Sequence, residues 1–298
     1  MVHLFLTVRG RYAGEEVQQD GIRLDAGWHG GELGLFEDLA SFWAAVAAAE
    51  AHDWIVSVHW PPVREGAGGY LRLLERDRDL RRQAAEGAVR ALQQAKAAGA
   101  RDVVFHFPYP PLAEDDPARW PGPAEWLAPD AWSRKSLADA ARQALEPLAE
   151  ARERLGTGVL LEIDGPARWF YVDGLWPELL GEFGVLGVCL DTARLGRLAR
   201  LYGRPPGELA DPLLPWVQAV HLHEGRASGE DPASGVPARP ALTFDDGWAG
   251  AAAVAEEAVR QNKRVRLVLQ HRPALATPEE TEESLGWVRK LARGQEAG

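Results

Sequence analysis

The chain has 298 residues, of which 46% are apolar, so it is long enough to bury a large core. Its formal net charge of -11 at pH 7 disfavours nucleic acid and anionic membranes as partners. The single cysteine, Cys189, excludes an intramolecular disulfide, no apolar run reaches membrane-spanning length, and the first residues do not resemble a signal peptide. We therefore expect a cytoplasmic protein.

Short apolar runs rich in valine, leucine and phenylalanine predict strands, and longer alanine-rich segments with apolar residues three and four apart predict helices. Pro61 and Pro62 end one of these strands, and Gly99 ends a helix. The elements expected in the first part of the chain are strand 3–8, strand 31–36, helix 38–49, strand 54–59, helix 80–98 and strand 102–107.

The second part of the chain continues the alternation. A loop rich in proline and tryptophan, 108–129, is longer than a simple connection needs, and we expect it to help cover a site. Thr277 and Pro278 are typical of the start of a helix. The further elements expected are helix 136–155, strand 158–163, helix 176–183, strand 185–190, helix 195–202, strand 217–222, helix 249–261, strand 265–269 and helix 279–292.

Eight strands that alternate with helices predict a parallel sheet with helical connections. At this length, eight units favour an α/β fold of the (β/α)8 TIM barrel type, as one domain over residues 1–298. The alternative is an open, doubly wound sheet. No GxGxxG loop follows the first strand, so we expect no nucleotide cofactor.

Polar residues close several of these strands: His59, His106, Glu162, Asp191, His221 and Gln270. The carboxyl ends of barrel strands lie on one face, so these side chains can meet. One polar residue at a strand end is usually structural, but carboxylates and histidines together are ligands for Mn²⁺, Zn²⁺, Mg²⁺ or Co²⁺. Glu32, on the second strand, is interpreted as a surface carboxylate, with a position facing the pocket as the alternative if that strand forms.

The motifs HWPP, FHFP, LLEID, CLDTARLG, VHLHEG and LVLQH, in this order, resemble the xylose isomerase-like TIM barrel superfamily. That superfamily includes sugar phosphate isomerases and epimerases, inosose dehydratases and AP endonuclease family 2. The resemblance covers most of the chain from about His59 onward. It implies a divalent metal on Glu162, Asp191 and His221, with Gln270 where relatives have a fourth ligand, a glutamate.

The resemblance also implies an isomerase or epimerase that acts on a sugar, a sugar phosphate or a cyclitol. The metal would polarise substrate oxygens, and Glu162 or a histidine would move a proton. His59 and His106 are candidate catalytic residues, with pocket-wall histidines as the alternative interpretation. Four further residues are candidates for substrate binding: Trp60, Arg194, His223 and Gln270. We expect a carbohydrate-like small molecule as the partner and allow for a homodimer.

Two departures from the family pattern leave a second function open. Gln270 lacks the charge and basicity of the glutamate that two-base epimerisation uses, and Arg194 replaces the histidine of the family's DxxH motif. Arg194 either grips a substrate phosphate or carboxylate or pairs with Asp191. The alternative is therefore a metal-independent or non-catalytic barrel that binds a small anionic metabolite or a partner.

A nuclease like endonuclease IV is disfavoured. Residues 238–242 read ARPAL where that family has an Asp-x-His motif, and the net charge opposes DNA binding.

Overall fold

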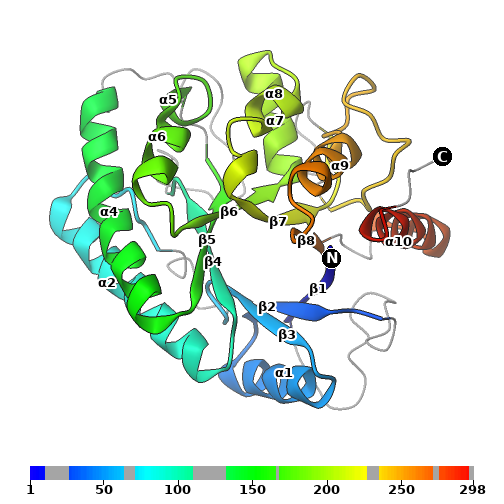
Figure 1. Cartoon of the computed structure of the whole chain (residues 1–298), viewed down its shortest axis with the longest axis horizontal. Coiled ribbons are helices and arrows are strands. Elements are labelled where there is room, and N and C mark those ends of the chain that lie inside the picture. Colours follow the sequence, from blue (N-terminus) through cyan, green and yellow to red (C-terminus); the bar gives the residue numbers. More distant parts are fainter. Residues whose placement is uncertain are drawn as a thin grey trace.

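In the computed structural model, eight strands close into a barrel (Figure 1). The strands lie around the barrel in the order of the sequence, and each is parallel to both of its neighbours. The structure describes residues 1–10, 27–63, 71–109, 132–165, 168–226, 235–270 and 275–294. The strands are β1 (His3–Gly10), β2 (Gly30–Phe36), β3 (Ile55–His59), β4 (Asp102–Phe107), β5 (Gly158–Ile163), β6 (Gly187–Asp191), β7 (Val217–Leu222) and β8 (Arg266–Leu269). The predicted TIM barrel is thereby confirmed.

Helices surround the barrel, with α1 beneath β2 and β3 and the pair α2 and α4 side by side in Figure 1. They are α1 (Leu39–Ala51), α2 (Arg78–Ala97), α4 (Arg134–Leu155), α5 (Arg168–Tyr171), α6 (Leu175–Glu182), α7 (Thr192–Tyr202), α8 (Pro206–Ala210), the 3-10 turn η1 (Leu214–Trp216), α9 (Ala251–Gln261) and α10 (Pro278–Ala292). None of the helices in the described ranges is both long and apolar enough to cross a membrane.

The helix boundaries follow local capping chemistry. Thr277 caps α10, its side chain accepting from Glu280 N at 3.2 Å while the Glu280 carboxylate accepts from Thr277 N at 3.0 Å. Pro278 occupies the first turn, as the sequence predicts. Gly156 ends α4 at a φ of 72°, a left-handed conformation that glycine adopts without strain.

The interior of the barrel contains an apolar layer between two polar ones. One inward-facing residue from each of six strands forms this layer. These residues are Phe5, Val104, Leu160, Cys189, Ala219 and Val268. Cys189 is fully buried, and burial raises the pKa of its thiol to about 12, so the thiol stays protonated. Because side chains alternate along a strand, residues two positions further along β4 to β7 also face the interior, at the carboxyl ends.

The polar layer at the amino ends of the strands contains a buried ion pair. Arg266 Nη1 lies 2.8 Å from Asp102 Oδ1 and 2.7 Å from Asp102 Oδ2, and Ser57 Oγ donates to Asp102 Oδ1 at 2.6 Å. The Arg266 guanidinium also lies 5.2 Å from the centre of the Phe5 ring. Asp102 and Arg266 are 3% and 2% exposed, so this pair closes the end of the barrel opposite the candidate site.

The long loop predicted to cover the site, 108–129, lies almost entirely outside the described residues. The helix predicted to begin at residue 195 begins earlier, at Thr192. The reason is that Asp191 is both the last residue of β6 and the N-cap of α7, so strand and helix meet without a loop.

Candidate functional site

Glu162 lies at the centre of the polar cluster at the carboxyl ends of the strands. Its side chain is 1% exposed, and His59 Nε2 donates to its Oε2 at 2.8 Å. Arg194 Nη1 donates to the other oxygen, Oε1, at 2.5 Å, and His106 Nε2 lies 3.4 Å from Oε2. One buried carboxylate therefore contacts groups from β3, β4 and α7.

Asp164, just beyond β5, holds His106 from the other side. His106 Nδ1 donates to Asp164 Oδ2 at 2.5 Å, and Tyr171 Oη donates to the Asp164 carbonyl at 3.0 Å. The sequence places Asp164 on the same face of the chain as Glu162, but its contact with His106 emerges only when β4 and β5 pair. Asp164 thereby fixes the orientation of the imidazole.

Asp191 contributes to the site and to the fold at once. Its Oδ1 accepts from the backbone N–H of Arg194 at 2.9 Å, which caps α7, and its Oδ2 accepts from His223 Nε2 at 3.0 Å. Thr192 Oγ1 lies 3.0 and 2.6 Å from the carbonyl oxygens of His221 and His223, so its hydroxyl can donate to one of them. The start of α7 is thus attached to the end of β7.

Glu32 lies inside the barrel, so its interpretation as a surface carboxylate is wrong. Its exposed fraction is 0%, and His221 Nε2 lies 2.9 Å from Glu32 Oε1. The reason is the alternation along β2, where Leu33 packs into the outer core and Glu32 therefore points inward. That alternation is visible in the sequence GGELGLF and could have placed Glu32 correctly.

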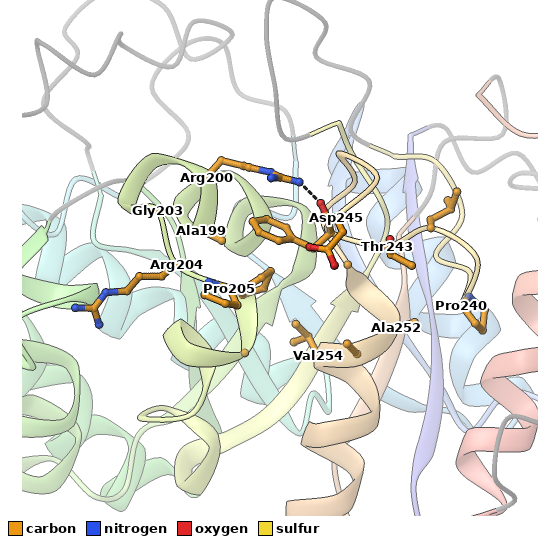
Figure 2. Close-up of a pocket in the computed structure, with 16 residues that line it drawn as sticks. Ala199, Arg200, Gly203, Arg204, Pro205, Pro240, Thr243, Asp245, Ala252 and Val254 are labelled. Carbon is orange, nitrogen blue, oxygen red and sulfur yellow. Dashed lines mark hydrogen bonds between the residues drawn. The ribbon is translucent and has the colours of Figure 1, made fainter.

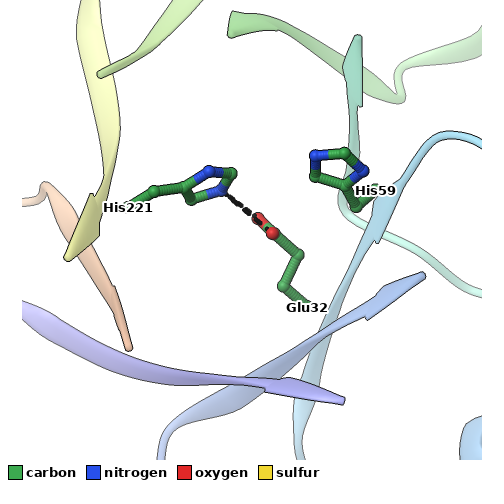
Figure 3. Close-up of side chains that lie close together, drawn as sticks. All are labelled: Glu32, His59 and His221. Atoms are coloured by element: carbon green, nitrogen blue, oxygen red, sulfur yellow. Dashed lines mark hydrogen bonds and ion pairs between the residues drawn. The ribbon is translucent and has the colours of Figure 1, made fainter. Parts of the chain in front are cut away.

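His221 lies between two carboxylates. Its Nε2 faces Glu32, while its Nδ1 lies 3.3 Å from Glu162 Oε1. Figure 3 shows the side chains of Glu32, His59 and His221 extending from β2, β3 and β7 toward one another. The His59 and His221 ring centres are 5.8 Å apart.

The electrostatics of the cluster keep its carboxylates ionised. Burial alone would raise the pKa of Glu162, but Arg194, His106, His221 and His59 hold it well below its usual range. Burial likewise opposes ionisation of Asp191, yet His223 and Arg194 lower its pKa to about 2.

Histidines of the cluster respond in opposite directions. Burial lowers the pKa of His106, outweighing the neighbouring carboxylates. Burial would lower the pKa of His221 as well, but the Glu32 and Glu162 carboxylates raise it well above its usual range. Beside Glu162, the neutral imidazole is therefore favoured for His106 and the protonated imidazole for His221.

Two of the predicted substrate-binding residues, Gln270 and Trp60, directly follow barrel strands, and the Trp60 side chain packs against the core outside the barrel. Gln270 follows β8, is half-buried, and its backbone N–H donates to Leu222 O at 3.2 Å. Trp60 follows β3, is also half-buried, and its ring centre lies 6.4 Å from that of Phe105. Their proposed contacts with a substrate stay predictions.

Three groups of side chains among the described residues could hold a metal ion, each with its ligand atoms within 4.8 Å of one another. The groups are Glu162–Asp191–His221, His59–His106–Glu162 and Glu32–His59–His221. The first is the set that the family resemblance implies. The third contains Glu32.

A separate cavity of about 680 Å³ lies outside the barrel between α7, α8 and the start of α9 (Figure 2). The Arg200 guanidinium lies 3.7 Å from the centre of the Phe244 ring there and donates to the Phe244 carbonyl. None of the predicted site residues lines this cavity, so it is distinct from the cluster.

The comparison with solved structures gives the class of fold. An IolI protein with a bound zinc atom superposes with a TM-score of 0.61 at 12% identity, covering 91% of each chain. A D-tagatose 3-epimerase-like protein gives 0.58 at 15% identity over 89% of each chain. An AP endonuclease of family 2 from Brucella melitensis gives 0.53 at 15% identity, covering 97% of this chain and 98% of that one.

These likenesses, all at low identity, show that the chain has the fold of the xylose isomerase-like TIM barrels, which the sequence motifs predict. No family model matches the sequence. No curated protein matches it either.

Proposed function

We propose that this protein is an isomerase or epimerase of a carbohydrate-like small molecule, a sugar, sugar phosphate or cyclitol, and that it uses a divalent cation at the carboxyl end of the barrel. The observation that carries the proposal is the buried cluster in which Glu162, Asp191 and His221 offer ligand atoms within 4.8 Å of one another. Sugar epimerases among the structural neighbours support the substrate class.

The charge of the cluster fits a cation. Three buried carboxylates, Glu162, Asp164 and Asp191, lie 2.5, 3.6 and 3.8 Å from the Arg194 guanidinium. A fourth buried carboxylate, Glu32, contacts His221. Buried charges are costly unless they are paired, and the donor set of carboxylates and imidazoles suits Mn²⁺, Zn²⁺, Mg²⁺ or Co²⁺. When bound, such an ion supplies Lewis acidity to adjacent substrate oxygens.

The chain's own residues would handle the proton and the substrate. Glu162 accepts from His59 Nε2 at 2.8 Å, so this pair can take a proton from a substrate carbon and return it. His106, held by Asp164, is placed to donate or accept at a substrate oxygen. At 24% side-chain exposure, Arg194 is the most exposed of the charged groups at the cluster and is suited to a substrate anion.

One observation favours the second candidate, a metal-independent or non-catalytic barrel that binds a small anionic metabolite or a partner. The Arg194 guanidinium lies 2.5 Å from Glu162 Oε1 and 3.8 Å from Asp191 Oδ2, close to two of the three expected metal ligands. A fixed cation in this position can neutralise the carboxylates without a metal.

Turnover and metal content test the proposal together. Protein purified without chelator should contain a divalent metal and should convert members of a panel of sugars, sugar phosphates and cyclitols when Mn²⁺ is supplied. Glu162→Gln should lower kcat/KM by roughly 100-fold or more, because general acid–base catalysis contributes at least that factor. Glu178→Gln, at an exposed ion pair, is the matched control and should leave it unchanged.

Absence of turnover with every substrate and cation would overturn the enzyme proposal. Binding of an anionic sugar in the presence of chelator, lost in Arg194→Ala, would instead support the alternative.

A further inference from the structure

We propose that, with Arg194 in the position observed, the divalent cation binds to Glu32, His59 and His221 rather than to Glu162, Asp191 and His221. This inference deepens the proposed function and rests on it only in placing a cation at this end of the barrel. The site would draw on β2, β3 and β7, and its donor set is one carboxylate and two imidazoles. That set suits Zn²⁺, Co²⁺ and Mn²⁺.

The geometry of the three side chains satisfies the first requirement of such a site. One oxygen of Glu32 and one nitrogen each of His59 and His221 lie within 4.8 Å of one another. The exposed fractions of the three residues are 0%, 6% and 0%. Their side chains converge from three strands in Figure 3, so the ligands are held on rigid elements before any ion arrives.

Gly34 keeps His59 in this position. A Cβ atom at residue 34 would lie 2.6 Å from the His59 carbonyl oxygen and 2.9 Å from the His59 Cβ. Any larger residue would therefore clash with His59 and displace it from its present position. The backbone of β2 thus supplies Glu32 and, two residues later, the space that lets His59 approach it.

His221 can serve a cation on either of its two sides. Its Nε2 faces Glu32 at 2.9 Å and its Nδ1 faces Glu162 Oε1 at 3.3 Å. Metal-binding histidines usually donate their second ring N–H to a carboxylate. With a cation beside Glu32, Nε2 would be the ligand and Glu162 would accept from Nδ1–H.

Arg194 decides between the two sides. Its guanidinium lies 2.5 Å from Glu162 Oε1, 3.6 Å from Asp164 Oδ1 and 3.8 Å from Asp191 Oδ2. A divalent ion on the Glu162–Asp191 side would face this positive charge at close range, which is strongly unfavourable in a buried site. On the other side, the ion-pair partner of Glu32 is the His221 imidazole, which can release its proton when it binds a metal, whereas the Arg194 guanidinium stays charged.

Glu32 also supplies the charge that the eighth strand lacks. Gln270, which follows β8, is uncharged. Because β1 separates β8 from β2 in the closed barrel, the Glu32 carboxylate provides a negative charge two strands away from Gln270. The set Glu162–Asp191–His221 would become available when Arg194 moves away, for example to bind an anionic substrate. Arg194 would then determine where the cation binds.

Isosteric amide substitutions on the two sides test the inference. Titration of chelator-treated protein with Zn²⁺ and Mn²⁺, followed by calorimetry, should show at least tenfold weaker binding in Glu32→Gln. Asp191→Asn, the matched control on the Arg194 side, should bind within about threefold of the parent. The reverse order, with Asp191→Asn weakened and Glu32→Gln unchanged, would overturn the inference. Far-ultraviolet circular dichroism verifies that both variants are folded.

Anomalous diffraction from zinc-soaked crystals of the unmodified chain gives an answer that needs no variant. A peak coordinated by Glu32, His59 and His221 supports the inference, whether or not the protein turns over a sugar. A peak at Glu162 and Asp191 overturns it while leaving the proposed function intact. No binding of any divalent ion overturns it as well, together with the metal-dependent function.

Discussion

At the scale of single residues, Arg194 contacts three of the buried carboxylates of the cluster, Glu162, Asp164 and Asp191. It is the first-turn residue of α7, and its backbone N–H is fixed by Asp191 Oδ1 at 2.9 Å. That bond directs the side chain back over the barrel, where the guanidinium contacts Glu162. A cation tethered in this way would compete with a metal ion for the same carboxylates.

Removing this charge should strengthen cation binding. We expect Arg194→Met to bind Mn²⁺ and Zn²⁺ at least tenfold more tightly, because a close like-charge contact near a protein surface is worth up to about 4 kcal/mol. Calorimetric titration measures the change. Arg204→Met, an exposed arginine outside the cluster, is the control and should bind like the parent. Unchanged affinity in Arg194→Met would show that the guanidinium does not compete.

The same residue scale shows where prediction from sequence stops. The identities of Glu162, Asp191 and His221 can be predicted because each closes an apolar run, a local signal. The inward direction of Glu32 follows from the alternation along β2, but its contact with His221 does not, because His221 is far away in the sequence and comes close only when the barrel closes. The position of the Arg194 side chain likewise follows from the strand–helix junction, not from the residue type.

At the scale of elements, the strands need polar residues at both ends of the barrel for different reasons. The carboxyl ends carry the candidate site, whereas the amino ends carry the ion pair of Asp102 with Arg266. Both partners are at most 3% exposed, so each depends on the other for compensation of its charge.

Breaking this pair should destabilise the barrel. We expect Asp102→Ala to lower the free energy of unfolding by about 3–5 kcal/mol, because it leaves the Arg266 charge buried and unpaired. Replacing both residues, by Asp102→Leu with Arg266→Met, should recover most of the loss. Urea unfolding followed by fluorescence measures both. Glu182→Gln, at the exposed contact with Arg142, should cost no more than about 1 kcal/mol. A small effect of Asp102→Ala would contradict the assigned role.

Glu224 connects β7 to the start of α9. Its carboxylate accepts from Ala249 N at 2.8 Å and from Ala251 N at 2.7 Å, and its exposed fraction is 0%. Burial raises the pKa of this carboxyl from 4.5 to about 7, although the backbone N–H groups act in the opposite direction. The folded chain therefore binds this proton more tightly than the unfolded chain does.

The sign of the resulting pH dependence follows from linkage. The stabilising contribution of protonated Glu224 is complete below pH 4.5 and is lost as the pH rises through about 7. We expect the parent to lose roughly 2–3 kcal/mol of unfolding free energy between pH 5 and pH 8 through this group. Glu224→Gln cannot titrate, so the difference between the two proteins should narrow over this range. Parallel urea titrations at several pH values would contradict the assignment if the difference stayed constant.

At the scale of the whole molecule, the number, order and approximate bounds of the strands can be predicted because each buried parallel strand is a continuous apolar run. The presence of eight strand–helix units then predicts that the sheet closes into a barrel. What the pattern cannot supply is which inward side chains meet across the interior, since opposite strands are joined by no hydrogen-bond register. The contact of Glu32 on β2 with His221 on β7 is of that kind.

A cation bound across the interior should therefore stabilise the whole barrel. Glu32 and His221 are 189 residues apart, so their shared ion would connect the first part of the chain to the last. At 100 times its dissociation constant, a ligand that binds only the folded state adds about 2.7 kcal/mol. For a chain of this size we expect the melting temperature to rise by roughly 5 °C when Zn²⁺ or Mn²⁺ is added, measured by differential scanning fluorimetry. The double variant Glu32→Gln with Glu162→Gln removes a carboxylate from each of the three candidate groups and should show no rise. An equal rise in that variant would place the stabilising ion elsewhere on the molecule.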